Sequence, residues 1–231
     1  MYDLFDEHEL AVERKRLYGV YPAQVTDIKD PDGQGRVKIR LPWSPDQESG
    51  YAVWARLATL MGGNDRGTWF IPDPGDEVLV LFEGGDPRRP YVVGALWNGK
   101  DKPPEKMDGD GKNNKKVIAS RRNIRITLDD SEGRETITIE TPGGQTVTLS
   151  DSPAAVELSD STGNSIRMSS SGISIEAIGK LSITTTTFEA SAALLKVEAP
   201  MSKFSGIAKS DTVLTTSTIS TTYMPGVGNL L

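Results

Sequence analysis

The fold is decided by the stretch TITIETPGGQTVTLS, residues 136–150. Ile137 and Ile139 alternate with polar residues, and Val147 and Leu149 do the same after a Pro-Gly-Gly turn. Because successive side chains of a β-strand point to opposite faces, each half predicts a short strand with one apolar face. The stretch therefore predicts one unit of a repeated β coil or of stacked hairpins.

The same alternation continues on both sides, from residue 123 to residue 204, with Gly-containing turns between the apolar groups. The further apolar groups are Ile124, Ile126 and Leu128, then Val156 and Leu158, Ile166 and Met168, Ile173 and Ile175, and Leu181 and Ile183. Two aliphatic side chains per strand make a thin core, and the strands leave much backbone edge to satisfy. The ladder therefore predicts an obligate oligomer in which several copies wind around one axis.

The composition argues against several kinds of function. The chain of 231 residues has no cysteine and one histidine, His8, so disulfides, thiolate metal sites and His-dependent catalytic triads are not expected. Its net charge of −6 argues against a nucleic-acid or anionic-membrane partner held by bulk electrostatics. No transmembrane span, secretory signal or phosphate-binding Gly-rich loop is recognisable. The expectation is a protein without cofactor, metal or catalytic residues.

Residues 18–100 have a different, compact β texture, and all four Trp residues lie before residue 100. Alternating runs flank a Pro-Asp-Gly-Gln-Gly turn at residues 31–35, which is typical of a hairpin. Further strands are expected at residues 53–59, 68–71, 77–83 and 90–96. About five short strands in some eighty residues predict a small barrel of the oligonucleotide/oligosaccharide-binding (OB) type.

The expected division of the chain follows from these textures. Residues 1–17 form a lead-in and residues 18–100 the OB-fold domain. The charged, Pro- and Gly-containing residues 101–122 form a linker. Residues 123–210 form the β ladder, and residues 211–231 a C-terminal strand, because Thr and other β-prone residues dominate there.

Four motifs of the first domain occur in an order that resembles a known family. They are DPDGQGRVKI at residues 30–39, WARLA at 54–58, PGDEVLV at 74–80 and GDPRRPYVVG at 85–94. The set resembles the baseplate assembly protein V family of contractile phage tails, which includes the valine-glycine repeat spike proteins of type VI secretion. The resemblance covers about residues 18–100, and the layout after it fits through residue 204.

The resemblance implies an all-β protein in which an OB barrel is followed by a trimeric, intertwined β-helix (β-prism). It implies a homotrimeric central spike that joins a tube hub to a tip and pierces the target envelope in transient contact with its membrane. Trp54, Val78, Val80, Val92 and Val93 are the expected barrel core.

This chain departs from two members of the family. Some spikes insert a lysozyme domain after the barrel, and the segment between barrel and ladder is too short here to hold one. Other spikes end in a His-x-His apex that binds iron, and no histidine follows His8. The end of the chain is therefore expected to dock a separate tip protein of the proline-alanine-alanine-arginine (PAAR) repeat type. The residues expected at that contact are Tyr223, Pro225, Leu230 and Leu231.

The location and the N-terminal partner follow from the same resemblance. Type VI spikes usually carry hub domains fused ahead of the barrel, and only about seventeen residues precede it here. A phage tail or extracellular injection particle with a separate hub protein is therefore favoured, with residues 1–17 docking to that hub. Assembly in the bacterial cytoplasm is expected.

Two other functions were weighed against the spike. An OB-fold nucleic-acid-binding protein would use Trp43, Trp69 and Arg88-Arg89 for stacking and phosphate contacts, but the domain is not basic. A glycan-binding or glycan-cleaving β-helix protein would use paired carboxylates. The pairs in question are Asp129 with Asp130 and Asp151 with Glu157. A third feature, residues 108–113, only faintly resembles a calcium loop.

Overall fold

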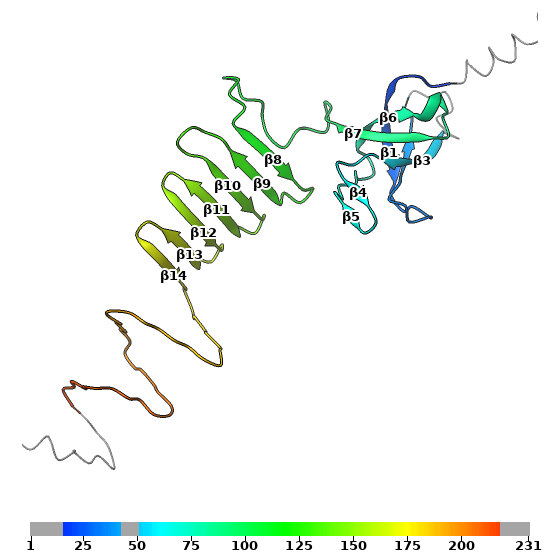
Figure 1. Ribbon diagram of the computed structural model, residues 1–231. Coiled ribbons are helices and arrows are strands. Elements are labelled where there is room, and N and C mark those ends of the chain that lie inside the picture. Colours follow the sequence, from blue (N-terminus) through cyan, green and yellow to red (C-terminus); the bar gives the residue numbers. More distant parts are fainter. Residues whose placement is uncertain (1–15, 43–50, 218–231) are drawn as a thin grey trace, which may run out of the picture. The chain divides into compact units, whose positions relative to one another are not determined.

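The computed structural model describes residues 16–42 and 51–217, and these contain a β-barrel, a long antiparallel sheet and a strandless segment (Figure 1). The described residues include no α-helix and one 3-10 turn, η1 (Glu83–Gly85). The expected all-β class is confirmed.

Five strands close the barrel in the order β1-β2-β3-β7-β6. They are β1 (Val20–Asp27), β2 (Val37–Arg40), β3 (Ala52–Leu57), β6 (Glu77–Phe82) and β7 (Pro90–Leu96). Four pairings are antiparallel, and β3 with β7 is parallel, which closes the ring. Because a closed barrel has no free edge, every strand finds two neighbours within one chain.

Aliphatic side chains of alternating strand positions fill the barrel interior. Its buried residues are Ala23, Val25, Val37, Ile39, Leu41, Ala55, Val78, Val80, Phe82 and Val92. Branched side chains dominate because they suit extended backbone and pack closely on a pleated surface. Val78, Val80 and Val92, expected in the core, lie there.

The expectation that Trp54 and Val93 also belong to the core was wrong. Val93 is 41 % exposed, because Val92 beside it points inward and consecutive strand residues face opposite sides. Trp54 is half-buried on the outer side of β3, where the Arg36 guanidinium lies 5.9 Å from its ring centre. Ala55 takes the inward position of that strand.

The expected strand at residues 68–71 does not form. Instead, β4 (Gly62–Gly63) and β5 (Arg66–Gly67) make a small separate hairpin, and the Thr68 N–H donates to the Met61 carbonyl at 3.0 Å. A Cβ on Gly67 would lie 2.6 Å from that carbonyl oxygen, so only glycine fits. The glycines thus redirect the chain into a projecting turn.

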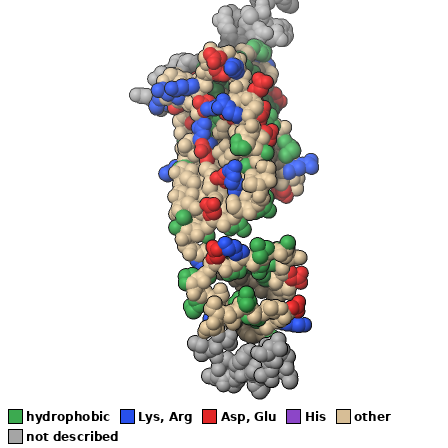
Figure 2. All heavy atoms as spheres, turned by 90° about the vertical axis from the view of Figure 1, so that its left-hand side faces the viewer, with side chains coloured by type: hydrophobic (Ala, Val, Ile, Leu, Met, Phe, Trp, Pro, Cys, Tyr) green, Lys and Arg blue, Asp and Glu red, His purple; other side chains and the backbone are tan. Residues whose placement is uncertain are grey.

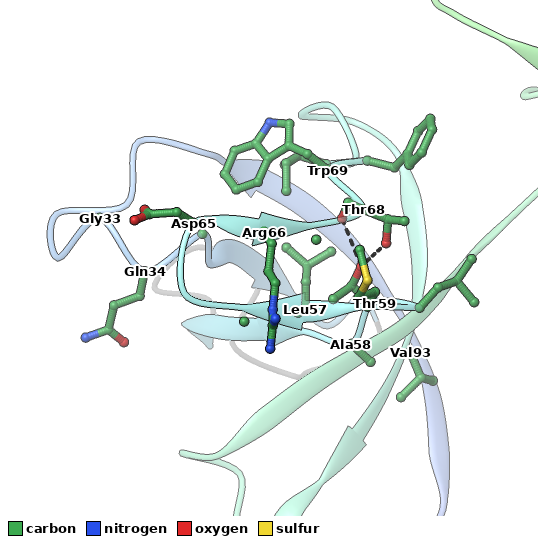
Figure 3. A pocket seen from close by; sticks show the side chains of 18 residues that line it. Gly33, Gln34, Leu57, Ala58, Thr59, Asp65, Arg66, Thr68, Trp69 and Val93 are labelled. Carbon is green, nitrogen blue, oxygen red and sulfur yellow. Dashed lines mark hydrogen bonds between the residues drawn. The ribbon is translucent and has the colours of Figure 1, made fainter.

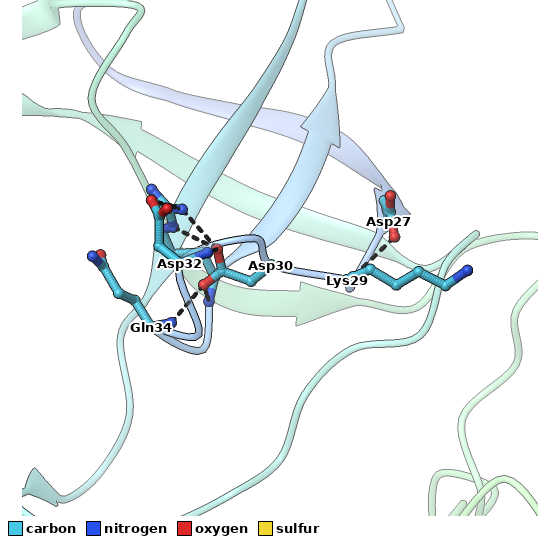
Figure 4. A network of polar contacts seen from close by, with 6 residues as sticks. Asp27, Lys29, Asp30, Asp32 and Gln34 are labelled. Carbon is cyan, nitrogen blue, oxygen red and sulfur yellow. Dashed lines mark hydrogen bonds and ion pairs between the residues drawn. The ribbon is translucent and has the colours of Figure 1, made fainter.

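Asp30 organises the turn between β1 and β2 (Figure 4). Its carboxylate accepts backbone N–H bonds from Asp32, Gln34 and Arg36, the shortest being 2.7 Å from Gln34. The Arg36 guanidinium donates to the same carboxylate at 2.6 Å. These donors favour the ionised form and hold the pKa of Asp30 well below its usual range.

Seven strands then form one antiparallel sheet in simple chain order, from β8 to β14 (Figure 1). They are β8 (Lys115–Ala119), β9 (Arg125–Asp129), β10 (Thr136–Glu140), β11 (Thr146–Asp151), β12 (Ala154–Ser159), β13 (Ser165–Ser169) and β14 (Gly172–Glu176). Each strand pairs with the next along the chain, so the stacked hairpins predicted from the sequence are present.

The sheet differs from the expected ladder at both ends. Strand β8 lies inside residues 101–122, where only a linker was expected, and it pairs with β9 through Ile118 and Ile126. No strand forms at Leu181 and Ile183, nor elsewhere in residues 177–217. That segment is extended backbone with bends at residues 178, 179, 186, 193, 200, 206, 211 and 216.

Candidate functional site

Two rows of aliphatic side chains cross the sheet from strand to strand on one face, and this apolar face is the candidate site. The first row is Ile118, Ile126, Ile139, Val147, Leu158, Ile166 and Ile175, and the second is Leu128, Ile137, Leu149, Val156, Met168 and Ile173. The rows are continuous because every strand pair from β9 to β14 keeps a register in which apolar residues stand opposite one another, and Ile118 of β8 extends the first row.

The apolar face is uncovered in a single chain. Exposure is 37 % at Ile126, 41 % at Ile139 and 44 % at Leu158, and it reaches 71 % at Ile173 near the last strand. Within the part of the chain that the structure describes, the buried core is confined to the barrel. A contiguous apolar face of this extent normally marks a contact with another molecule.

The opposite face of the sheet is polar. Thr127, Thr138 and Thr148 stand in one row, and Glu157 and Arg167 continue it with an ion pair of 2.5 Å. Figure 2 shows one side of the molecule, on which charged and apolar side chains are scattered among other side chains and backbone. The sheet is therefore two-sided, with only one face suited to burial.

The second apolar row is closed by a charge at its β8 end. Lys116 stands opposite Leu128, and its Nζ lies 2.8 Å from an Asp130 carboxylate oxygen and 2.6 Å from the Asn113 carbonyl. Because the ammonium group is held at the edge of the sheet, the apolar surface of this row begins at β9.

Acidic residues of the sheet hold its turns. The Asp160 carboxylate accepts from the side chains of Asn164 and Thr162 and from their backbone N–H groups, and its pKa is held well below the usual range. Asp129 accepts from the Ser131 hydroxyl and N–H, which lowers its pKa. Both carboxylates are stabilised as ions and fix loop geometry.

Residues 181–217 leave both their backbone and their side chains without strand partners in this chain. The larger apolar side chains here are at least 59 % exposed: Leu181, Ile183, Phe188, Leu194, Leu195, Val197, Met201, Phe204, Ile207, Val213 and Leu214. Around the Lys196–Glu198 ion pair, Leu195 and Val197 alternate with the charges. Such alternation is typical of a strand with one buried face, so this segment also needs a partner.

The structure does not assemble the residues of the nucleic-acid alternative into one groove. A cleft of about 1100 Å³ on the barrel is lined by Trp69 and the β4–β5 hairpin but by neither Arg88 nor Arg89 (Figure 3). Arg88 pairs with Asp86, whose pKa it lowers to about 2, and Arg89 pairs with Glu83. Trp43 lies outside the described residues. The cleft was not predicted, although Gly62, Gly63 and Gly67 signalled a turn.

Three of the four carboxylates of the glycan alternative have other partners, and the fourth, Asp151, is exposed at the end of β11. Asp130 pairs with Lys116, Glu157 pairs with Arg167, and the pKa of Asp129 is lowered by Ser131. A glycosidase acid requires a carboxyl group whose pKa is raised, so Asp129 has the opposite environment.

Two other sets of residues bear on the predicted sites. Tyr223, Pro225, Leu230 and Leu231, expected at the tip contact, lie outside the described residues. In the calcium-like stretch, the Asp108 carboxylate accepts the N–H of Asp110 and so closes its own turn. Across residues 16–42 and 51–217 no group of three or more His, Cys, Asp or Glu side chains gathers.

Comparison with known protein families identifies the barrel domain and the sheet. Residues 21–97 match the OB domain of type VI secretion and phage-baseplate injectors, and residues 136–201 match the C-terminal trimerisation domain of phage baseplate V. The two matches together span more than half of the 231 residues. The chain belongs to the phage baseplate V family. The second match covers β10 to β14, which carry most of the apolar face.

Relatives of this family member are spike proteins of type VI secretion systems. VgrG1a of Pseudomonas aeruginosa is 28% identical over 122 residues, covering 49% of this chain and 19% of that protein. VgrG5 of the same organism is 34% identical over 100 residues, covering 41% and 13%. VgrG3 of Vibrio cholerae is 35% identical over 77 residues, covering 32% and 7%. The chain thus spans less than a fifth of these relatives.

Residues 16–42 and 51–217 of this family member contain no helix with the length and apolar character needed to cross a membrane.

Proposed function

We propose that this chain is a structural central spike of a contractile injection machine and works as a homotrimer. The observation that carries the proposal is the apolar face of the sheet, which one chain leaves uncovered and which lies within the trimerisation-domain match. Three copies with their apolar faces turned toward one axis bury both rows together in a single column.

The physical demands of piercing agree with this arrangement. A shaft driven through an envelope needs resistance to unfolding more than it needs chemistry. In a three-chain prism every layer of strands supports the layers beside it, while small Ser and Thr side chains keep the outside slim and wettable. At roughly 4.7 Å per strand, the seven paired strands alone stack to about 30 Å, comparable with a bilayer's hydrocarbon core of about 30 Å.

The partners at the two ends are part of the proposal. A hub or tube protein is proposed at the N-terminal end and a PAAR-repeat-type protein at the C-terminal end, docked through Tyr223, Pro225, Leu230 and Leu231.

The relatives are spike proteins of type VI secretion, and one match is an actin cross-linking toxin of Vibrio cholerae. Since that match spans 77 residues and 7% of the toxin, we propose a mechanical and not a catalytic role for this chain.

Native mass spectrometry of the purified chain tests the proposal. We expect a species of three times the 25.0 kDa chain mass. A monomer that keeps its β structure by circular dichroism at micromolar concentration would overturn it, because the apolar face would then be stable in water.

A further inference from the structure

A basic segment, defined here as residues 100–125, interrupts an otherwise acidic chain. It carries nine Lys and Arg against four Asp and Glu, whereas the whole chain has 26 against 32. The net charge of −6 therefore conceals a local excess of positive charge in the stretch that runs from the end of the barrel to the start of β9. Screening confines surface electrostatics to about 8 Å at physiological salt, so a ligand meets this local charge and not the total.

More than half of these cations are available to a ligand. Lys115, Lys116, Arg121 and Arg125 have carboxylate partners, at 3.9, 2.8, 3.1 and 3.4 Å. The other five form no ion pair with any residue that the structure describes, and all are exposed: Lys100, Lys102, Lys106, Lys112 and Arg122. Four of the five are lysines, whose long stems let the ammonium group move to meet a charge.

Exposed apolar side chains accompany the free cations. Trp97 stands three residues before the segment and is 70 % exposed, and Met107 inside it is 95 % exposed. Tryptophan prefers the boundary between water and lipid, because its ring is apolar and its N–H remains hydrated. Clustered lysines beside such side chains are the composition that anchors proteins to anionic lipid surfaces.

From these observations we propose that the basic segment, together with Trp97 and Met107, binds an anionic lipid surface. Each lysine near such a surface adds a modest electrostatic attraction, so the four free lysines of one chain give weak and reversible binding. In the proposed trimer, on which this step rests, three copies of the segment act together and raise the avidity for the lipid surface. Nucleic acid fits less well, because Trp97 is the one aromatic side chain at residues 97–125 and strands of bases need several stacking platforms.

Co-sedimentation with vesicles tests the inference on the full chain. The probes are phosphatidylcholine vesicles with and without about 30 mol% phosphatidylglycerol, at about 0.05 and 0.5 M salt. The test variant replaces Lys100, Lys102, Lys106 and Lys112 with Gln. The matched control replaces Lys29, Lys180, Lys203 and Lys209 with Gln, which removes the same charge from exposed lysines that also lack ion pairs in the described residues.

We expect the parent chain to bind the phosphatidylglycerol vesicles in a salt-sensitive way and the test variant to bind at least about tenfold more weakly. The control variant is expected to bind like the parent, and Trp97→Ser to bind severalfold more weakly. Equal binding to neutral vesicles, an equal loss in both lysine variants, or full competition by a single-stranded oligonucleotide would overturn the inference. Native mass spectrometry of every variant separates this outcome from failure of the trimer.

Discussion

At the scale of single residues, Asp30 shows how one side chain holds the Asp-Pro-Asp-Gly turn of residues 30–33. Its side chain is 6 % exposed, and it accepts bonds from three backbone N–H groups and from Arg36. Asp32, in contrast, is 57 % exposed, and among the described residues its carboxylate contacts only Arg36. The buried carboxylate therefore fixes the turn that joins β1 to β2, while its exposed neighbour adds little.

Replacing Asp30 with Ala is expected to lower the Tm of the barrel by about 5 °C or more, because three N–H groups and Arg36 lose an acceptor. The matched Asp32→Ala change is expected to lower it by less than about 2 °C. Tryptophan fluorescence measures this transition selectively, since all four Trp residues precede residue 100. Equal shifts in the two variants would show that the Asp30 network does not hold the turn.

The same residue sets a pH dependence. Since the folded-state pKa of Asp30 is depressed, its contribution is present above the unfolded-state pKa of about 3.9 and is lost as pH falls through the folded-state value. An Asp30→Asn chain is therefore expected to be less stable than the parent at neutral pH, with a difference that shrinks progressively below about pH 4. A difference that stayed constant into strong acid would contradict this account.

At the scale of elements, the sheet shows how far pattern alone predicts structure. The strands from β9 to β14 were predicted because Ile, Val and Leu alternate with polar residues in each. Strand β8 was missed, because Lys115 and Lys116 occupy two of its five positions and only Val117 and Ile118 carry the signal. In the barrel, the pair Val92-Val93 carries no alternation, so the inward residue followed from the register with β6 and not from the sequence.

A charge placed on the apolar face of β10 is expected to destabilise the protein far more than a charge placed on its polar face. Ile139→Asp puts a carboxylate into the apolar row and is expected to destabilise the assembly by at least about 3 kcal/mol per chain and to abolish the trimer. Thr138→Asp, on the polar face of the same strand, is expected to change stability by less than about 1 kcal/mol. Native mass spectrometry and thermal denaturation compare the two, and an intact Ile139→Asp trimer would show that another face is buried.

At the scale of the whole molecule, two segments of the chain differ in which groups lack partners within a single chain. Residues 115–176 pair their own backbone and lack only cover for one face. Residues 181–217 lack cover for their side chains and also pair with no strand in the described part of the chain. Sequence alternation could not separate the two, because an extended strand has the same side-chain pattern whether its neighbour belongs to its own chain or to another copy. A single chain thus forms a complete sheet over residues 115–176, whereas residues 181–217 form an extended backbone without strand pairing.

Hydrogen exchange in the full chain tests whether other copies supply those missing partners. Amides of residues 187–199 are expected to exchange about 100-fold or more slowly than unstructured peptide in the trimer, and to lose protection when denaturant dissociates it. Amides of β10 to β13 are the control, since they are paired within one chain. Because buried backbone groups must find partners, fast exchange at 187–199 in a trimer of confirmed mass would mean that only the first segment of the shaft is intertwined or packed.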